Sequence, residues 1–482
     1  MSYELKKIVY LQKMNVMFNK NIFLIIYAIF IVLSCNRFKP AQSDFVSFST
    51  DTVFFDTIFT QIGSTTIAFM VYNKHNYPVK INKIFLNGNP NSKFRINVDG
   101  VSQNTVEDVI IDAQDSIFIF VEVTINPGKD SLLVEDSITF LSGNNRQSVI
   151  LTAFGKDVHL IKSQTLTTQT WVNDKAYLIY NYAYVDSGQT LTIEPGAELY
   201  FHYNSGLYVA GTLVANGTFE KPISFKGDRI DNQTFYKDKP GQWNGVFFLP
   251  SSSNNILNYL NLKESVYGIY VDSALNTNYP KLIINNSQIN RCSRIGLCFI
   301  NSYVIVLNTI VSDCFLNNLA MFNSGNYEFY HCTIQNDYSF APRNSPSLGI
   351  KNYLNINNKI TYGNITALFF NTIIYGNNEN EFVVDAYTNG NISLILKNCL
   401  VKVKNSDTIA SFFQNCIFNK DPEYKDKYNL DYRLKNNSPA INKGFFDIVQ
   451  NNQSLLRFDM NNTDRLADQM PDIGAIEYKQ TD

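Results

Sequence analysis

A short phrase recurs along the second half of the chain and constrains the fold more than any other feature. Its copies are Asn308-Thr309-Ile310, Cys332-Thr333-Ile334, Asn371-Thr372-Ile373, Asn398-Cys399-Leu400 and Asn415-Cys416-Ile417. Asn286-Ser287 with Ile289 is a sixth copy, shifted by one residue. Because the first copies follow one another at about 22 to 24 residues, the repeat indicates a solenoid.

A parallel β-helix fits this repeat better than a leucine-rich repeat, which needs leucine at fixed positions that this chain does not provide. Each coil would hold three short strands, and equivalent residues would stack about 4.8 Å apart from coil to coil. Asn tolerates left-handed backbone at the corners, while the 36 Phe and 29 Tyr favour strands. Residues 164–420 would make roughly ten coils at this period. The sequence therefore predicts an all-β chain with a parallel β-helix over 159–425.

The stretch before the repeat predicts a separate β-sandwich over 51–158. It alternates apolar and polar residues in short runs that are separated by turn formers. Seven or eight strands in about 105 residues is the spacing of an immunoglobulin-like (Ig-like) domain. The strand end Val71-Tyr72-Asn73, the turn Asn126-Pro127-Gly128 and the closing Gly155 resemble bacterial Ig-like domains of the abnormal-spindle and hydin group. This resemblance implies a spacer or a contact module.

The N-terminal residues predict an exported lipoprotein, with a signal peptide over 1–35 and a polar tether over 36–50. Residues 21–34 form an apolar run with the length of a signal h-region, and Cys35 follows it directly. A small residue before a Cys at this place resembles a bacterial lipobox, which implies cleavage before Cys35 and acylation of that residue. An uncleaved anchor helix is the alternative, because Leu33 is an unusual residue at its position. The predicted location is the cell envelope, lipid-anchored to a bacterial membrane, with the outer membrane favoured and the protein facing the periplasm or the exterior.

The first coils of the repeat carry a series of strand and turn phrases. In order, they are Leu191-Thr192-Ile193-Glu194-Pro195-Gly196, Gly206-Leu207-Tyr208-Val209, Pro222-Ile223-Ser224-Phe225, Gly241-Gln242-Trp243-Asn244-Gly245-Val246 and Gly268-Ile269-Tyr270-Val271. The series resembles bacterial right-handed parallel β-helix proteins of the pectate-lyase-like superfamily. The resemblance implies a right-handed helix with inward apolar residues on each strand.

Two phrases near the C-terminus resemble the end of the same proteins. They are Ser438-Pro439-Ala440-Ile441-Asn442-Lys443-Gly444 and Asp472-Ile473-Gly474-Ala475-Ile476-Glu477-Tyr478. The pair is similar to the choice-of-anchor Q module, which implies a closing module over 426–482. Asn442 stands where that module usually has Asp, which weakens any argument that the position binds charge. We expect Asp472, Glu477 and Arg465 to hold the module together rather than to contact a ligand.

No complete catalytic set is visible in the sequence. Asn462-Thr463-Asp464 matches one polygalacturonase phrase, but it lies in the terminal segment and the chain has no Asp-Asp pair. Hydrolysis of a glycosidic bond needs two carboxylates about 5 to 10 Å apart. Stacked coils could bring four aspartates together, and solvated turn residues are the alternative. These four are Asp272, Asp313, Asp337 and Asp385.

The cysteines of the repeat predict packing rather than chemistry. They lack metal-ligand spacing, so neither a metal nor a cofactor is expected. Cys332, Cys399 and Cys416 occupy the recurring phrase, where a small apolar side chain would point inward. Cys292 and Cys314 are 22 residues apart and should lie one above the other. Their state stays open between free thiols and a disulfide.

Aromatic residues are the candidate ligand-binding set. Tyr and Trp on a flat sheet can stack on sugar rings or anchor a protein partner, and inward stacking that fills the coil is the alternative. The candidates are Trp243, Tyr267, Tyr270, Tyr327 and Tyr330.

The sequence therefore favours a non-catalytic, lipid-anchored envelope protein that presents a β-helix surface to a glycan or a protein. Its partners would be the membrane, through the anchor, and a polysaccharide or another envelope protein. Nucleic acid is not an expected partner, because a net charge of −2 offers no basic field for phosphates. A polysaccharide lyase or glycoside hydrolase with an unrecognised active site is the alternative, and a purely structural spacer is the third hypothesis.

Overall fold

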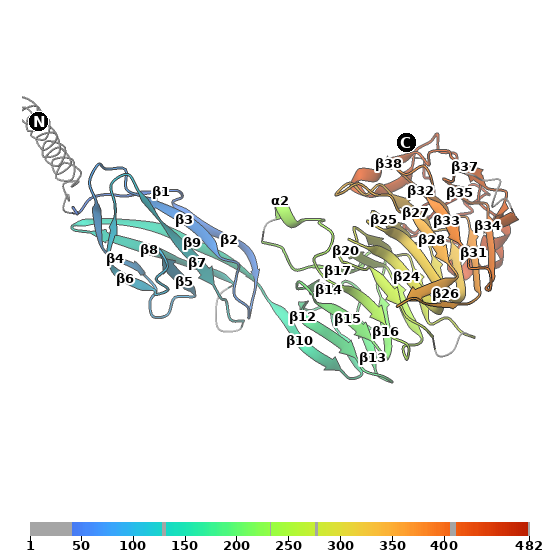
Figure 1. Cartoon of the computed structure of the whole chain (residues 1–482), viewed down its shortest axis with the longest axis horizontal. Coiled ribbons are helices and arrows are strands. Elements are labelled where there is room, and N and C mark those ends of the chain that lie inside the picture. The colour runs from blue at the N-terminus through green and yellow to red at the C-terminus, as the bar shows by residue number, and fades with distance from the viewer. Residues whose placement is uncertain (1–40, 128–131, 232, 275–277, 405–410, 481–482) are drawn as a thin grey trace, which may run out of the picture. The chain divides into compact units, whose positions relative to one another are not determined.

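The computed structural model describes residues 41–127, 132–231, 233–274, 278–404 and 411–480. The chain divides into two compact units, blue to cyan and green to red in Figure 1. The first contains residues up to 155 without 56–61, and the second contains those six residues and everything from Lys156 onward. The predicted signal peptide, its Cys35 and the first part of the tether lie outside the described residues.

Two antiparallel sheets form the first unit, with the orders β1-β3-β7-β5 and β2-β9-β8-β4-β6. The strands are β1 (Ser47–Phe48), β2 (Thr52–Phe59), β3 (Ile67–Tyr72), β4 (Val79–Leu86), β5 (Phe94–Val98), β6 (Thr105–Ile111), β7 (Ser116–Val123), β8 (Leu133–Ser142) and β9 (Asn145–Lys156). The sheets pack face to face, since the ring centroids of Phe48 and Phe140 are 4.8 Å apart and those of Phe55 and Phe94 are 6.1 Å apart. A β-sandwich is therefore present, and its assignment as Ig-like stays a prediction.

The sandwich begins before the predicted boundary at residue 51. Ser47 and Phe48 pair with β3, although the sequence assigned them to the tether. The backbone amides of Asp44 and Val46 donate to the side chains of Ser142 (2.9 Å) and Gln147 (2.9 Å). These bonds attach residues 44–48 to the sheets, which polar composition alone could not reveal.

The second unit is a parallel β-helix with three faces, in which each strand pairs with its equivalent in the next coil (Figure 1). Face 1 contains the end of β12 (Ala176–Val185), β15 (Gly206–Val209), β18 (Gly245–Phe248), β21 (Ile269–Val271), the starts of β24 (Ile295–Leu307) and β26 (Asn317–Tyr330), β28 (Leu348–Lys351) and β33 (Phe382–Asp385). Face 2 contains β11 (Gln169–Trp171), β13 (Thr190–Ile193), β16 (Thr212–Asn216), β19 (Asn255–Asn258), β22 (Leu282–Asn285), the ends of β24 and β26, β31 (Ile365–Phe370), β34 (Ile392–Lys397) and β36 (Phe413–Gln414).

Face 3 closes each coil. It contains the start of β10 (Val158–Leu166), whose end lies on face 1, the start of β12, β14 (Glu198–Phe201), β17 (Ile223–Gly227), β20 (Leu260–Lys263), β23 (Gln288–Asn290), β25 (Ile310–Ser312), β27 (Thr333–Asn336), β32 (Ile373–Gly376), β35 (Leu400–Val401) and β37 (Ile417–Phe418). One continuous cluster of buried side chains fills the interior from Ile161 to Val403. The predicted parallel β-helix is thus confirmed.

The recurring phrase forms the corner between faces 2 and 3. Its first residue has left-handed backbone with φ between 45° and 52°, at Asn286, Asn308, His331, Asn371, Asn398 and Asn415. Asn tolerates this conformation better than most residues, which explains its recurrence. His331 takes the Asn position in its coil, so the phrase there starts one residue before the predicted Cys332.

The second residue of the phrase points inward and bonds its own turn. The Thr309 hydroxyl donates to the Leu307 carbonyl (2.6 Å), and the thiols of Cys332 and Cys399 donate to carbonyls two residues back (3.5 Å each). The predicted inward packing of these thiols is confirmed. Cys292 and Cys314 also occupy equivalent positions in neighbouring coils, and both are free thiols.

The C-terminal segment packs on the outside of the β-helix. It contains β38 (Tyr424–Asp426), η2 (Lys427–Asn429), β39 (Asp431–Leu434), α3 (Phe446–Asn451) and α4 (Gln453–Leu456). Asp472 joins its two closing phrases by accepting from the backbone of Asn442 (2.7 Å) and Tyr478 (2.6 Å), while Arg465 donates to Glu477 (2.8 Å). The expected tying role of Asp472, Glu477 and Arg465 is confirmed.

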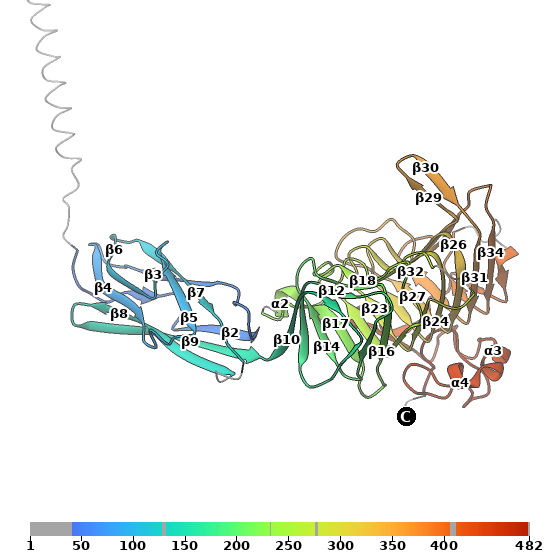
Figure 2. The same cartoon turned by 90° about the horizontal axis from the view of Figure 1, so that it is seen from below.

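Two insertions interrupt the coils. The short helix α2 (Gln233–Tyr236) lies between β17 and β18, and the hairpin β29 (Tyr353–Ile356) and β30 (Lys359–Tyr362) projects from the body in Figure 2. None of the helices within the described ranges has the length and apolar character needed to cross a bilayer.

Candidate functional site

A column of aromatic side chains runs along the outer surface of face 1. Tyr184, Tyr208, Phe247 and Tyr270 are in register on four consecutive strands, from β12 to β21. Each strand alternates between inward and outward residues, so all four rings share the outward side and are partly exposed. The stacking of coils therefore converts one aromatic residue per coil into a continuous strip, which we call the aromatic column.

The rings of the aromatic column lie close to one another. The centroids of Tyr208 and Phe247 are 5.0 Å apart with nearly parallel planes, and Tyr270 is 5.8 Å from Phe247. Tyr267 adds a fifth ring beside them, 6.0 Å from Tyr270, and the Arg294 guanidinium lies 5.6 Å from its centroid. Burial raises the pKa of Tyr270 to about 12, so its hydroxyl stays neutral at physiological pH. The column is thus an aromatic platform with hydroxyl edges, and one guanidinium lies beside it.

The same column continues into a hollow. Beyond Tyr270 its residues become small, with Cys298, Ala320 and Gly349 in register on the next three strands. The small residues Ala320 and Gly349 line a hollow of about 350 Å³ on face 1, whereas Cys298 is buried in a cluster against which Tyr267 and Tyr270 pack. The lining of the hollow includes Asn317, Ala320, Phe322, Ser345, Pro346, Lys351 and Asp385. The hollow therefore lies on the same face as the rings, and its nearest column residue, Ala320, is two coil steps beyond Tyr270.

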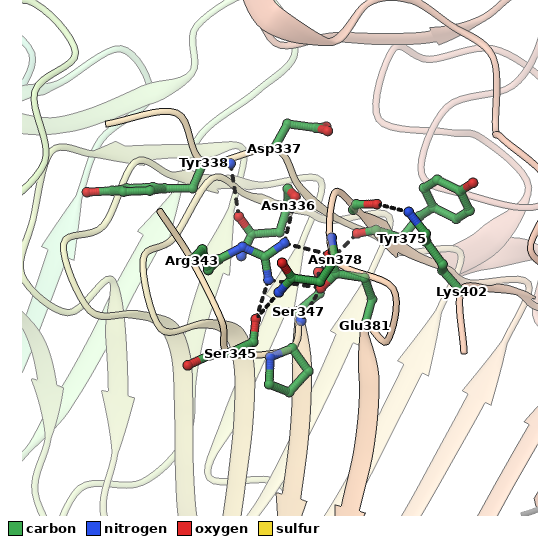
Figure 3. Close-up of polar contacts among 12 residues, drawn as sticks. Asn336, Asp337, Tyr338, Arg343, Ser345, Ser347, Tyr375, Asn378, Glu381 and Lys402 are labelled. Atoms are coloured by element: carbon green, nitrogen blue, oxygen red, sulfur yellow. Dashed lines mark hydrogen bonds and ion pairs between the residues drawn. The ribbon is translucent and has the colours of Figure 1, made fainter. Parts of the chain in front are cut away.

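A buried ion pair lies next to residues 345 and 346, which line the hollow, and Figure 3 shows the polar contacts of this pair. Arg343 donates to both carboxylate oxygens of Glu381, at 2.5 and 2.9 Å, and also donates to the Ser345 carbonyl. Glu381 further accepts from the backbone and the hydroxyl of Ser347, at 2.7 and 2.8 Å. Both side chains are almost fully buried, and each charge is compensated by the other and by hydrogen bonds. The pair therefore positions residues 345 and 346 and is not available to a ligand.

Polar groups border the far side of the hollow. Lys351 lies 3.0 Å from the Asp385 carboxylate, and the Tyr353 hydroxyl donates to the same carboxylate at 2.9 Å. The hydrogen bond from Lys351 lowers the pKa of Asp385, so its carboxylate is ionised at neutral pH. These groups can exchange hydrogen bonds with the hydroxyls of a bound sugar.

The five aromatic candidates divide between three environments. Tyr270 lies on the aromatic column and Tyr267 lies beside it, so both are on the surface that a ligand-binding role requires. Trp243 and Tyr327 are 0% and 1% exposed inside the coils, so their proposed ligand contact is wrong. Tyr327 lies two positions before the buried Phe329 on β26, so both side chains face inward. Trp243 precedes β18 and stacks on the buried Phe201, with ring centroids 4.0 Å apart. Tyr330 is on face 2, away from the aromatic column.

Sequence reasoning missed Tyr184, Tyr208 and Phe247. A signal for two of them was present, because Gly206-Leu207-Tyr208-Val209 and Gly245-Val246-Phe247-Phe248 repeat the pattern of Gly268-Ile269-Tyr270-Val271. In each phrase the third residue is aromatic and lies between two inward residues. Aligning the three phrases would have placed their aromatic residues in one outward column.

The predicted carboxylates do not form a hydrolytic pair. Asp313 and Asp337 do meet at one corner, where the Asp337 amide donates to Asp313 at 3.0 Å. They are only 8% and 4% exposed, and Lys427 of the C-terminal segment pairs with Asp337 at 2.9 Å. Burial raises the pKa of Asp313 to about 6. Because both carboxylates are enclosed, neither a sugar ring nor a water molecule can enter between them.

The other two aspartates are far apart on face 1. Asp272 follows β21 and Asp385 ends β33, and the strand register puts four coil steps between them. At about 4.8 Å per step this separation is roughly 19 Å, well beyond the span of a glycosidase pair. Within the described part of the chain, no cluster of three His, Cys, Asp or Glu residues has the arrangement of a metal site.

No family model matches the chain, and no curated protein matches its sequence. Among solved structures, the catalytic unit of a thermostable GH87 α-1,3-glucanase from Streptomyces thermodiastaticus matches over 73% of this chain and 75% of its own, at 8% identity and a TM-score of 0.27. A protein of unknown function from Porphyromonas gingivalis matches over 26% of this chain and 60% of its own, at 9% identity and a TM-score of 0.18. A family 123 glycoside hydrolase from Clostridium perfringens matches over 24% of this chain and 30% of its own, at 7% identity and a TM-score of 0.18. The matched parts span less than two thirds of the length of the last two structures.

Proposed function

We propose that this chain is a lipid-anchored envelope protein whose β-helix binds a polysaccharide along face 1 without cleaving it. The aromatic column from Tyr184 to Tyr270 carries the proposal, and the hollow lies further along the same face. Sugar rings present apolar faces and polar edges, and aromatic side chains on a flat surface complement the apolar faces. Because the column spans several coils, it suits an extended chain of sugars better than a single monosaccharide.

The carboxylate positions support a binding role rather than hydrolysis. Of the four aspartates that the sequence offered for catalysis, two are enclosed and two lie roughly 19 Å apart. The lipid anchor is supported by the apolar run over 21–34 and by Cys35 alone. Anchoring and glycan binding are therefore tested separately.

Binding is tested with the mature protein on a panel of soluble neutral and acidic polysaccharides, by affinity electrophoresis and calorimetry. We expect at least one polysaccharide to bind, and Tyr208→Ala or Phe247→Ala to weaken it about tenfold, as central aromatic contacts do. Tyr428→Ala removes a 68% exposed ring away from the aromatic column and serves as the control. Equal binding by all three variants would place the polysaccharide elsewhere and contradict the proposal.

The absence of cleavage is tested on the polysaccharide that binds. Reducing ends and unsaturated products should stay at the level of a protein-free sample during long incubation. A steady release of either product by the parent protein would show an enzyme and contradict the non-catalytic part of the proposal.

Anchoring is tested by growing cells that express the full chain with radiolabelled palmitate. The parent should incorporate the label and fractionate with membranes, whereas Cys35→Ser should not be labelled. Label that persists in Cys35→Ser would contradict lipidation at this residue.

A further inference from the structure

A second groove lies on the outer surface of face 2, and its floor is aliphatic. Ile256, Ile283 and Ile305 are in register on β19, β22 and β24, so they form an outward column about 4.8 Å apart. Ile256 remains 40% exposed. The groove has a volume of about 470 Å³, within the usual range of small-molecule sites.

The C-terminal segment forms one wall of this groove. Leu456 of α4 is buried against Leu307 of the coils, while the neighbouring Leu455 stays 55% exposed beside the opening. Asn258 and Asn285 lie along the groove with their side-chain amides, which supply a polar rim. The result is an open hydrocarbon surface between the coils and a helix, and surfaces of this kind commonly bind a partner or a ligand.

A carboxylate ends the aliphatic column. Glu328 is the residue in register with Ile305 on the next strand, and it lines the groove. The hydroxyl of Tyr303 donates to one of its oxygens at 2.7 Å, and the hydroxyl of Tyr330 donates to the other at 2.7 Å. These two donors fix the carboxylate plane without neutralising its charge, and no ion pair with a lysine or arginine joins it among the residues that the structure describes.

The two phenols remain donors over the physiological range. Burial raises the pKa of Tyr303 to about 12, with a further contribution from Glu328, and burial also raises the pKa of Tyr330. Both phenols therefore keep donating to Glu328, and each of its oxygens keeps a free lone pair for a further donor.

We propose that the face 2 groove binds a small cationic amphiphile, with its hydrocarbon chain on Ile256, Ile283 and Ile305 and its ammonium group on Glu328. The apolar floor recognises the chain, and the fixed, unpaired carboxylate recognises the charge. An ammonium group has three donors and no acceptor, which matches a carboxylate that already accepts from two phenols. This site is separate from the polysaccharide surface on face 1 and does not depend on it.

The test compares three probes of equal chain length, n-octylamine, n-octanol and n-octanoate, by calorimetry on the mature protein at neutral pH. We expect octylamine to bind about tenfold more tightly than octanol, because one charge-assisted contact separates them, and octanoate to bind most weakly. Glu328→Gln should remove the preference for the amine and leave octanol unchanged. Ile283→Asn should weaken all three probes.

Controls separate this proposal from general effects of charge or folding. Glu379→Gln removes an exposed carboxylate that is paired with Lys404 and should leave all three affinities unchanged. The unfolding midpoint of Glu328→Gln should match that of the parent.

Equal affinity of the parent for amine, alcohol and acid, or an amine preference that survives Glu328→Gln, would overturn the proposal. Binding of a leucine-rich peptide with one lysine, without binding of octylamine, would also overturn it in favour of a polypeptide partner.

Discussion

The interior of the β-helix and its outer surface obey the same stacking rule, but the rule has different consequences in the two regions. Inside, columns such as the recurring corner phrase repeat polar and small residues that satisfy the backbone and fill the coil. Outside, the aromatic column and the aliphatic column of face 2 repeat apolar residues that stay partly exposed. Repetition inside therefore stabilises the fold, whereas repetition on the surface produces the extended strips that we propose as binding sites.

The largest difference between the two regions is expected when one aromatic ring is removed from each. Tyr327 is buried among coil residues, and its truncation in Tyr327→Ala should cost roughly 3–5 kcal/mol of unfolding free energy. Tyr270→Ala on the aromatic column should cost about 1 kcal/mol or less, because partly exposed residues lose little on truncation. Denaturant unfolding of both variants measures the difference.

Polysaccharide affinity should show the opposite order. Tyr270→Ala should weaken binding, while Tyr327→Ala, assayed well below its unfolding midpoint, should retain the affinity of the parent. Similar losses of stability in both variants would mean that the aromatic column is part of the core, and the distinction between the two regions would fail.

A smaller effect on the unfolding free energy is expected from the buried carboxylate of Asp313. The folded-state pKa of Asp313 is about 6, above the value of about 3.9 in an unfolded chain, so the folded protein binds this proton more tightly. The stability contribution of Asp313 is therefore fully present below pH 4 and is lost as the pH rises through 6. The loss amounts to about 3 kcal/mol at pH 7.

Asp313→Asn should remove that dependence. Asn tolerates the left-handed backbone of this position, where φ is 51°, and keeps an oxygen to accept from the Asp337 amide. The variant should be more stable than the parent at pH 7, and the gap should close toward pH 4 in denaturant titrations. A gap that does not change with pH would show that Asp313 does not titrate in this range.

The interior could be predicted from sequence further than the surface could. The Asn and small residues of the corner phrase recur because backbone geometry demands them, so they leave a periodic signal. The aromatic column leaves a weaker one, because only alternation along each strand separates Tyr270 from the buried Tyr327, and loops of unequal length conceal the register. The groove of face 2 could not be predicted, since it depends on where α4 packs, and α4 begins 146 residues after Leu307 in the chain.

The smallest expected effect concerns one residue that links the interior to the closing module. Asn371 has left-handed backbone, its amide group bonds His331 at 2.8 Å, and its side-chain oxygen accepts from the Phe445 amide at 2.5 Å. Asn371→Ala should therefore cost about 1–2 kcal/mol, from backbone strain and the lost hydrogen bonds, in denaturant unfolding. Asn371→Gly relieves the strain but does not restore the lost bonds, so its unfolding free energy should lie between those of Asn371→Ala and the parent.

Asn415→Ala, in the last copy of the phrase, has the same backbone but a more exposed side chain, and it should cost less unfolding free energy than Asn371→Ala. Equal losses at 371 and 415 would mean that the corner strain alone, and not the bond to the module, determines the contribution of this column.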